Sequence, residues 1–267
     1  MFAFQYRKAK TLKEAGEWLA KDDEAKLLSG GMTLIPTLKA RLANPTQLID
    51  INDISELSGI EVKDGALIIG AATRHQQVAS SKVVRDAIPA LADLASHIGD
   101  PQVRNRGTLG GSVANNDPAA DYPSAVLGLN ARIITNKRVI ATDDFFQGMF
   151  ATALEPGELI VRIAFPLPKK AAYAKFPHPA SGYAMAGVFV AQNADGIRVA
   201  VTGAGPGVFR WSDAENALAK GMNAAAIEKL TLTADNLNED IHGTREYRAQ
   251  LVKVMAGRAA AAIAGKN

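Results

Sequence analysis

Two short glycine-rich segments constrain this chain more than any other feature of its sequence. Each places a Gly-Gly pair close to a hydroxyl residue: Gly30 and Gly31 precede Thr33, and Gly110 and Gly111 precede Ser112. Because glycine has no Cβ atom, such a pair turns tightly and brings its N–H groups close to a ligand, and the hydroxyls add adjustable donors. Two such loops facing each other would form a cradle of donors suited to a pyrophosphate. We therefore predict a dinucleotide site, with two ordinary tight turns as the alternative.

The glycines match neither of the common nucleotide-binding motifs. Neither pair is followed by the Gly-Lys-Ser/Thr of a P-loop. The segment nearest to GxGxxG begins at Gly203 and has Val208 where the third glycine belongs. Pro206 would also break the helix that a Rossmann fingerprint needs at this point. A Rossmann nicotinamide site is therefore not expected.

Composition excludes several other kinds of site. The 267 residues carry 30 Lys and Arg against 27 Asp and Glu, an excess too small to indicate nucleic-acid binding. The chain has no cysteine, so it holds neither a disulfide nor an iron–sulfur cluster on its own thiolates. Its four histidines lie far apart, and no metal site is expected. No apolar run approaches the roughly 20 residues of a membrane span, and the N-terminus lacks signal-peptide character, so we expect a cytoplasmic protein.

The order of the predicted elements suggests an α+β protein. A strand at 2–6, a helix from the capping box Thr11–Glu14 to about residue 20, and strands at 26–29 and 47–51 indicate a first β-α-β subdomain. A second unit follows, with a helix that begins near Thr73 and leaves His75 on the surface. Pro166 and Pro168 then mark a boundary.

The last hundred residues differ in pattern from the rest. Strands at 183–191 and 197–203, joined by a turn at 193–196, predict a β-hairpin. Three helices follow, at 212–220, 223–231 and 244–264. Helices grouped after a sheet indicate a separate α+β unit.

Read at full length, the glycine segments resemble the FAD-binding medium subunit of molybdenum hydroxylases, the family of carbon monoxide dehydrogenase, xanthine dehydrogenase and aldehyde oxidoreductase. The segment from Ser29 to Pro36 is similar to the family's AGGxSLxP loop, and that from Arg104 to Asp121 is similar to its RNxGTIGGSxAxADPAAD loop. His178 to Val188 resembles the start of the family's C-terminal domain. The departures are small: Met32 stands where several relatives have His or Gln, and Asn115-Asn116 replaces the common His-Ala.

The resemblance implies a fold and a division into domains. Residues 1–168 would form an FAD-binding domain of the PCMH or vanillyl-alcohol oxidase-like type, with subdomains at about 1–54 and 55–168. Residues 169–267 would form a small α+β domain of an antiparallel sheet and a three-helix bundle.

The resemblance also implies the residues that bind FAD. Asp121 corresponds to an acidic residue that accepts hydrogen bonds from FAD hydroxyls, Lys175 to a lysine near the flavin, and Tyr183 to a residue that covers the isoalloxazine. The full predicted set is Ser29, Gly30, Gly31, Met32, Thr33, Leu34, Ile98, Thr108, Leu109, Gly110, Gly111, Ser112, Asp121, Ile160, Lys175 and Tyr183. No residue is expected to act as a catalytic acid or base, because flavin carries the redox chemistry.

The family's division of labour implies the partners. A large molybdopterin subunit would oxidise the substrate, and a small subunit with 2Fe-2S clusters would pass electrons to FAD on this chain. The complex would be a dimer of heterotrimers, and no nucleic acid is expected as a partner. One alternative is a self-contained FAD-dependent oxidoreductase of the vanillyl-alcohol oxidase or MurB-like fold. Another is a non-catalytic partner or assembly protein.

Overall fold

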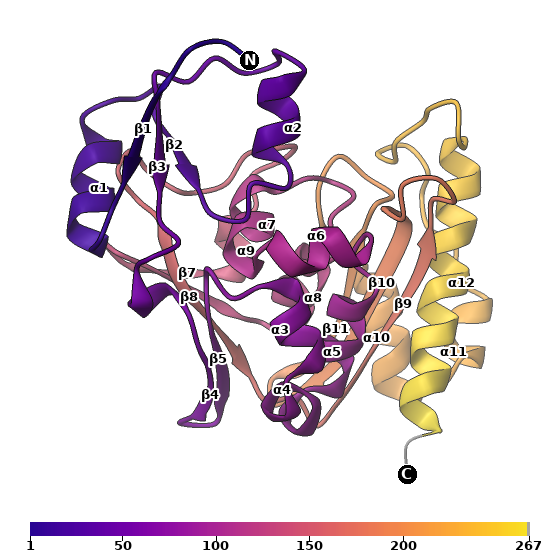
Figure 1. The fold of residues 1–267 in the computed structure, drawn as a ribbon. Coiled ribbons are helices and arrows are strands. Elements are labelled where there is room, and N and C mark those ends of the chain that lie inside the picture. Colours follow the sequence, from indigo (N-terminus) through magenta and orange to yellow (C-terminus); the bar gives the residue numbers. More distant parts are fainter. Residues whose placement is uncertain (266–267) are drawn as a thin grey trace.

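The computed structural model describes residues 1–265, in which three β-sheets follow one another along the chain (Figure 1). The first sheet is parallel, with β3 (Gln47–Asp50) between β1 (Gln5–Lys8) and β2 (Lys26–Leu28). Helix α1 (Leu12–Ala20) links β1 to β2, and the Thr11 hydroxyl caps it by accepting a hydrogen bond from the Glu14 amide at 3.1 Å. The predicted β-α-β unit is present, although its first strand begins at Gln5 rather than residue 2.

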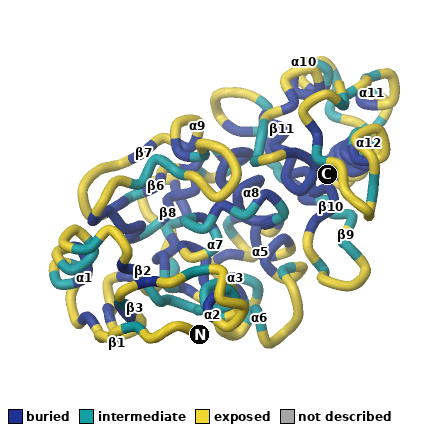
Figure 2. The backbone as a smooth tube through the Cα atoms, turned by 90° about the horizontal axis from the view of Figure 1, so that it is seen from above, coloured by how far each residue is buried: buried dark blue, intermediate teal, exposed yellow. Residues whose placement is uncertain are grey.

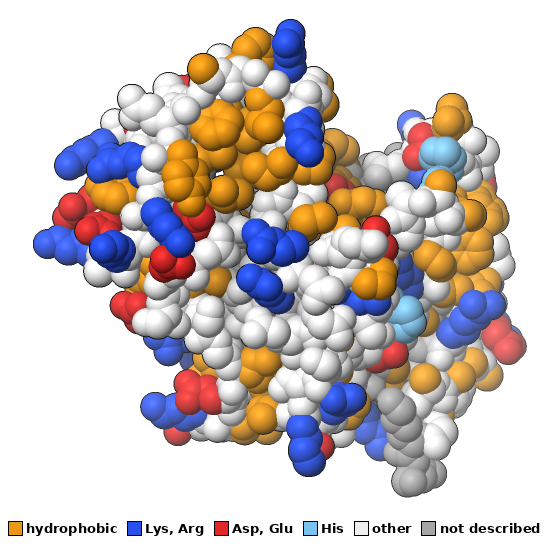
Figure 3. Space-filling view, viewed as in Figure 1, with side chains coloured by type: hydrophobic (Ala, Val, Ile, Leu, Met, Phe, Trp, Pro, Cys, Tyr) orange, Lys and Arg blue, Asp and Glu red, His pale blue; other side chains and the backbone are white. Residues whose placement is uncertain are grey.

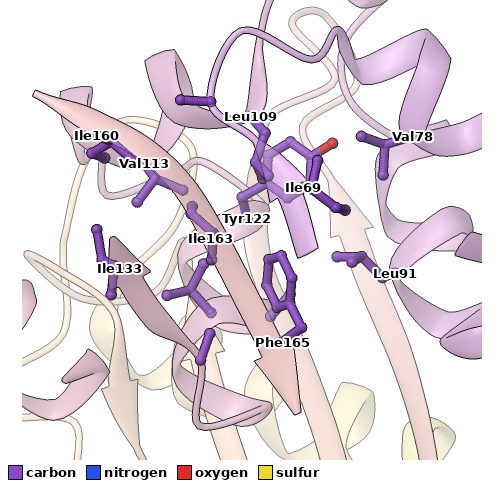
Figure 4. Close-up of a cluster of buried hydrophobic side chains, with 14 of the residues drawn as sticks. Ile69, Val78, Leu91, Leu109, Val113, Tyr122, Ile133, Ile160, Ile163 and Phe165 are labelled. Carbon is purple, nitrogen blue, oxygen red and sulfur yellow. The ribbon is translucent and has the colours of Figure 1, made fainter. Parts of the chain in front are cut away.

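The second sheet is antiparallel and lies within residues 60–166. Its strand order is β4-β5-β8-β6-β7, comprising β4 (Ile60–Lys63), β5 (Ala66–Gly70), β8 (Ile160–Pro166), β6 (Arg132–Thr135) and β7 (Val139–Ala141). Short helical segments occupy much of the connections: η1 (Ser55–Leu57), α3 (His75–Ser80), α4 (Lys82–Ala87), α5 (Pro89–Ser96), α6 (Pro101–Arg106), α7 (Leu109–Asn115), α8 (Tyr122–Gly128) and α9 (Thr142–Phe145). Figure 4 shows their apolar side chains, such as Leu91 and Leu109, meeting Ile163 and Phe165 of β8 in one core.

The third sheet is antiparallel and has the order β12-β11-β10-β9. The hairpin of β10 (Ala184–Asn193) and β11 (Gly196–Thr202) turns as the sequence predicts, and β12 (Phe209–Arg210) pairs with β11. Strand β9 (Lys170–Pro177) was not predicted, because its Lys- and Ala-rich sequence has low β propensity and it forms by pairing with β10. Helices α10 (Ser212–Lys220) and α12 (Arg245–Ala264) cover this sheet, and α11 (Ala225–Glu228), which is shorter than predicted, packs against these two helices.

Both faces of the third sheet are buried, and this fixes the C-terminal unit against the rest of the chain. Along β10, Val188 and Val190 pack with α10 and α12, whereas the alternate residues Phe189 and Ala191 pack into the core of the preceding unit. Side chains on a strand alternate between its faces, so β10 joins two cores. Figure 2 shows β10 and α8 as buried stretches between the two halves of the molecule. No helix within residues 1–265 is long and apolar enough to cross a membrane.

Candidate functional site

A cleft of about 730 Å³ lies where the two glycine loops meet the loop that precedes β10. Figure 3 shows the surface indented between the lobe that carries α2 (Leu34–Lys39) and the lobe of β9, β10 and α12. Most of the predicted site residues line this cleft: Ser29, Gly30, Gly31, Met32, Thr33, Leu34, Ile98, Thr108, Gly110, Gly111, Ser112, Asp121, Ile160 and Tyr183. Leu109 and Lys175 do not. Residues far apart in the sequence therefore meet in one concave site.

The first glycine loop offers free backbone donors. It leaves the end of β2, where the Asn52 side-chain amide donates to the Ser29 carbonyl oxygen at 3.0 Å. Gly31 has φ of +72°, which glycine adopts without strain. Within the described residues, the N–H groups of Gly30, Gly31, Met32 and Thr33 donate to no protein acceptor. Because partly buried amides require partners, those of Gly30, Gly31 and Met32 suit an anionic ligand, and the amide of the exposed Thr33 is free to join them.

The second glycine loop uses its backbone donors within the protein. The Leu109 amide donates to the Thr73 carbonyl at 3.0 Å, and the Gly110 amide donates to the Ala71 carbonyl at 2.8 Å. The Thr108 hydroxyl caps α7 by accepting from the Gly111 amide at 3.2 Å. We predicted a cradle of donors from both glycine pairs; in the structure the amides of Gly110 and Gly111 already have acceptors within the protein. The loop starts a helix that is hydrogen-bonded to the strand-to-helix connection at residues 71–73.

The two loops touch where glycine leaves room. The Ser29 and Thr108 hydroxyls lie 3.1 Å apart. A Cβ atom on Gly30 would collide with the Arg106 carbonyl oxygen and lie 2.7 Å from the Gly107 Cα. By contrast, a Cβ atom on Gly111 would approach only the Thr108 hydroxyl, at 2.8 Å, so this position faces the cleft. Gly30 is thus needed for the contact between loops and Gly111 for space in the site.

His75 is a buried part of the site, and its assignment to the surface was wrong. Its side chain is 5% exposed, packs against Tyr122, and lines the cleft beside Gly107. A Cβ atom on Gly107 would lie 2.5 Å from His75 Nε2, so the ring supports the second loop directly. Burial, assisted by the charge of Arg104, lowers the pKa of His75 to about 4, and the ring is neutral at pH 7. The sequence did contain a signal for the burial of His75: Val78, which is also buried, lies three residues later and so on the same face of the helix.

Asp121 anchors a buried polar cluster at the cleft wall. It is 4% exposed and accepts hydrogen bonds from the Tyr173 hydroxyl at 2.5 Å and from Lys175 Nζ at 3.0 Å. Burial raises the pKa of Asp121, and the Lys175 ammonium group opposes that rise. Lys175 also donates to the His97 carbonyl at 3.0 Å, so it acts as the buried counter-ion of Asp121. Tyr173 was not predicted, because β9 itself was missed.

Apolar and aromatic groups complete the walls. Ile98 follows α5, and Ile160 begins β8. Tyr183 lies directly before β10 with its ring partly exposed. Burial, followed by the carboxylates of Asp117 and Asp121, raises the pKa of the Tyr183 phenol, which therefore stays protonated. The cleft thus combines free amides, a buried carboxylate and apolar surfaces, as expected for a large and partly apolar ligand with an anionic centre.

Comparison with known proteins decides the family. Residues 2–168 match the model of the FAD binding domain in molybdopterin dehydrogenase. The chain is 34% identical to the glyceraldehyde dehydrogenase medium chain of Sulfolobus acidocaldarius, with 96% of both chains covered. It is 34% identical to the carbon monoxide dehydrogenase medium chain of Hydrogenophaga pseudoflava, over 96% of this chain and 95% of the relative. This chain is an FAD-binding medium subunit of the molybdenum hydroxylase family.

The structural comparison agrees with the sequence comparison. The medium subunit superposes on a chain of quinoline 2-oxidoreductase from Pseudomonas putida 86 with a TM-score of 0.89 and 30% identity, over 99% of this chain and 98% of that chain. The relatives are dehydrogenases and other oxidoreductases, and several are named as medium chains or subunits. The predicted α+β fold, the FAD cofactor and the oxidoreductase class are confirmed.

The medium subunit's cleft fits FAD on its own geometry. Four free amides in the first loop suit the anionic pyrophosphate. The open position at Gly111 leaves the space that a side chain would fill. Ile98 and Ile160 add apolar surface to the cleft, which suits the ring systems of a dinucleotide.

Proposed function

We propose that this medium subunit transfers electrons within a molybdenum hydroxylase complex. A small subunit with 2Fe-2S clusters delivers the electrons, and an external molecule accepts them. The FAD, when bound, supplies the redox chemistry of this site. The observation that carries the proposal is an FAD cleft in a chain without any cysteine, because the thiolates that hold iron–sulfur clusters must then come from another polypeptide.

The residues of the cleft have separate tasks in this proposal. The amides of Gly30 to Thr33 bind the pyrophosphate, and Gly111 admits it. Asp121 accepts hydrogen bonds from FAD hydroxyls, with its position fixed by Tyr173 and Lys175. Tyr183 covers the flavin ring, and Ile98 and Ile160 limit the access of water.

The proposal extends to the assembly, the domains and the location. We propose a dimer of heterotrimers that contains a large molybdopterin subunit and the iron–sulfur subunit, located in the cytoplasm. The chain would divide into an FAD-binding domain at 1–168, with subdomains at about 1–54 and 55–168, and a C-terminal domain at 169–267. The separation of the three sheets along the chain supports this division.

Anaerobic flavin bleaching tests the proposal. The isolated FAD-loaded chain should keep its flavin absorbance with aldehydes, purines or carbon monoxide and lose it with dithionite. Adding the co-purified iron–sulfur and molybdopterin subunits should allow one substrate class to bleach the flavin. Bleaching by an organic substrate in the isolated chain would contradict the proposal and favour a self-contained flavin oxidoreductase. A chain that binds no FAD would contradict both.

A further inference from the structure

The turn between β9 and β10 is built around the side chain of His178. The His178 Nδ1 atom accepts hydrogen bonds from the backbone amides of Ala180 at 3.2 Å and Ser181 at 3.3 Å. An imidazole nitrogen that accepts N–H groups carries no proton, so the ring is neutral, with its proton on Nε2. The base of the turn is closed without the ring, because the His178 amide donates to the Tyr183 carbonyl at 2.7 Å. The imidazole therefore organises the tip of the turn.

This turn forms part of the cleft. It joins two neighbouring strands of the third sheet (Figure 1), and residues 180–183 line the cleft. A Cβ atom on Gly182 would lie 3.7 Å from the Gly99 Cα, so the turn approaches residues 98–100, which line the cleft as well. Within the described residues, the amides of Ala180 and Ser181 donate to no acceptor other than His178. The shape of this part of the wall therefore depends on one side chain.

A second histidine packs against His178 from the loop that precedes α12. The His242 ring meets the His178 ring edge-on, with 4.3 Å between the ring centroids. Asp240 lies on the same loop, and its carboxylate accepts from the buried Arg248 at 2.7 Å, so these two charges compensate each other. His97 is the only histidine of residues 1–265 that pairs with a carboxylate. A positive charge on His178 would therefore gain no carboxylate partner and would face another histidine.

The ionisable groups on the cleft side of the turn have other roles. Lys175, three residues before His178 on β9, pairs with Asp121. Asp100 caps the start of α6. The Tyr183 phenol stays protonated, because burial and nearby carboxylates raise its pKa. His178 is therefore the ionisable group whose proton would directly break hydrogen bonds of the turn.

We propose that neutral His178 holds this turn in the shape that binds FAD, and that protonation of His178 releases it. The inference rests on the proposed function, in which Tyr183 covers the flavin. A proton on Nδ1 would make a donor of the atom that two amides approach, and both hydrogen bonds would be lost. His178 does not line the cleft itself, so it is a positioning residue.

The direction of the pH dependence follows from this arrangement. The FAD-bound turn prefers the neutral ring, so a bound proton and bound FAD oppose each other. Affinity for FAD should therefore be highest at alkaline pH and fall as the pH decreases through the range in which histidine ordinarily gains a proton.

The Kd for FAD of the full chain, measured by fluorescence titration at about pH 8 and about pH 5.5, tests the inference. The wild-type Kd should rise about tenfold at the lower pH, as expected for the loss of two neutral hydrogen bonds. His178→Asn is the conservative variant, because an asparagine oxygen accepts from backbone amides of a turn but does not titrate. Its Kd should match wild type at the higher pH and lack the tenfold rise. His178→Ala has no acceptor, and its Kd should be about tenfold higher at both pH values.

His242→Asn is the matched control, because it removes the neighbouring ring and leaves the acceptor of the turn in place. This variant should keep the wild-type pH dependence, with circular dichroism showing that every sample is folded at both pH values. Equal pH dependence in wild type and His178→Asn would overturn the inference, as would loss of that dependence in His242→Asn alone. Tyr183→Ala tests the proposed function separately: an unchanged Kd at the higher pH would contradict the role of Tyr183 at the flavin, which the inference requires.

Discussion

The two glycine loops share a sequence pattern but differ in what their backbones offer. The first loop leaves the amides of Gly30 to Thr33 without protein acceptors, whereas the second commits those of Leu109 and Gly110 to carbonyls at residues 71–73. The first follows β2, an edge strand of the small parallel sheet, and the second opens a helix packed into the main core. The same Gly-Gly pair can therefore supply donors in one place and space in another, depending on the structure that holds it.

The difference assigns separate tasks to the glycines. Gly30 is required because its Cα lies against the Arg106–Gly107 backbone, so it joins the loops. Gly111 is required because its missing side chain leaves the cleft open. Substitutions at these two positions should therefore fail in different ways, which gives a direct means to separate folding from cofactor binding.

The largest effect is expected from Gly30→Ala. The new Cβ would overlap the Arg106 carbonyl oxygen, and backbone atoms cannot move aside cheaply. We expect a loss of about 3 kcal/mol in the free energy of unfolding, together with loss of bound FAD. Urea denaturation and flavin absorbance on the same sample measure both. Gly257→Ala in α12, where no atom lies within 4 Å of the added Cβ, is the control. A stable Gly30→Ala variant with normal FAD content would contradict the claim that the contact between the loops requires glycine at this position.

A more selective effect is expected from Gly111→Val. Its side chain would enter the cleft and meet only the Thr108 hydroxyl. Displacing hydrogen bonds to an anionic group should weaken FAD binding about 100-fold, while the apo-protein should lose no more than the roughly 1 kcal/mol expected for disturbing the Thr108 cap. Gly257→Val introduces the same side chain into another helix and should leave the FAD affinity unchanged. If Gly111→Val retains FAD, the second loop does not border the cofactor.

Acid should weaken the support of the second loop through His75. In the unfolded chain this histidine protonates near pH 6.5, but in the fold its pKa is about 4. Between those values the unfolded state binds the extra proton, so stability falls as pH decreases. The loss attributable to His75 should reach about 2 kcal/mol between pH 7.5 and pH 5. Urea denaturation of wild type and His75→Gln at both pH values isolates it. Identical pH dependence in the two proteins would show that His75 does not titrate this way.

The smallest of these effects is expected from Thr108→Val. This change keeps the shape of the side chain but removes the cap of α7 and the contact with Ser29. We expect a loss of about 1 kcal/mol in the free energy of unfolding. Thr108→Ser keeps the hydroxyl and should retain wild-type stability. If Ser29→Ala alone reproduces the whole loss, the contact between loops outweighs the cap.

Local sequence patterns predicted much of the fold. The capping box at Thr11, the β10–β11 hairpin and the helix at 244–264 each depend on neighbouring residues, and each is present within a few residues of its predicted bounds. Strand β9 was missed because its pairing with β10 decides its conformation. The local pattern predicted the strand β10 but could not show that both of its faces are buried. A strand buried on one face and a strand buried on both could not be told apart from that pattern.

In the candidate site, too, the sequence predicted the features that local motifs specify and missed those that depend on distant residues. The glycine loops were found from sequence because their motif is long and specific. Three other features depend on residues more than thirty positions apart or on packing between elements. They are the burial of His75, the hydrogen bond from the Tyr173 hydroxyl to Asp121, and the hydrogen bonds from the Asn116 side chain to the loop near Gly148. The occupied amides of the second loop could not be predicted either, because their acceptors lie on the connection that follows β5.

Amide hydrogen exchange, measured by NMR on the apo and FAD-loaded chain, tests the division of tasks between the loops most directly. The amides of Gly30 to Thr33 should exchange rapidly in the apo-protein and become strongly protected when FAD binds. Those of Leu109 and Gly110 should be protected in both states, because their acceptors are protein carbonyls. Protection gained at Leu109 and Gly110 on FAD binding, with no change at Gly30 to Thr33, would contradict the account.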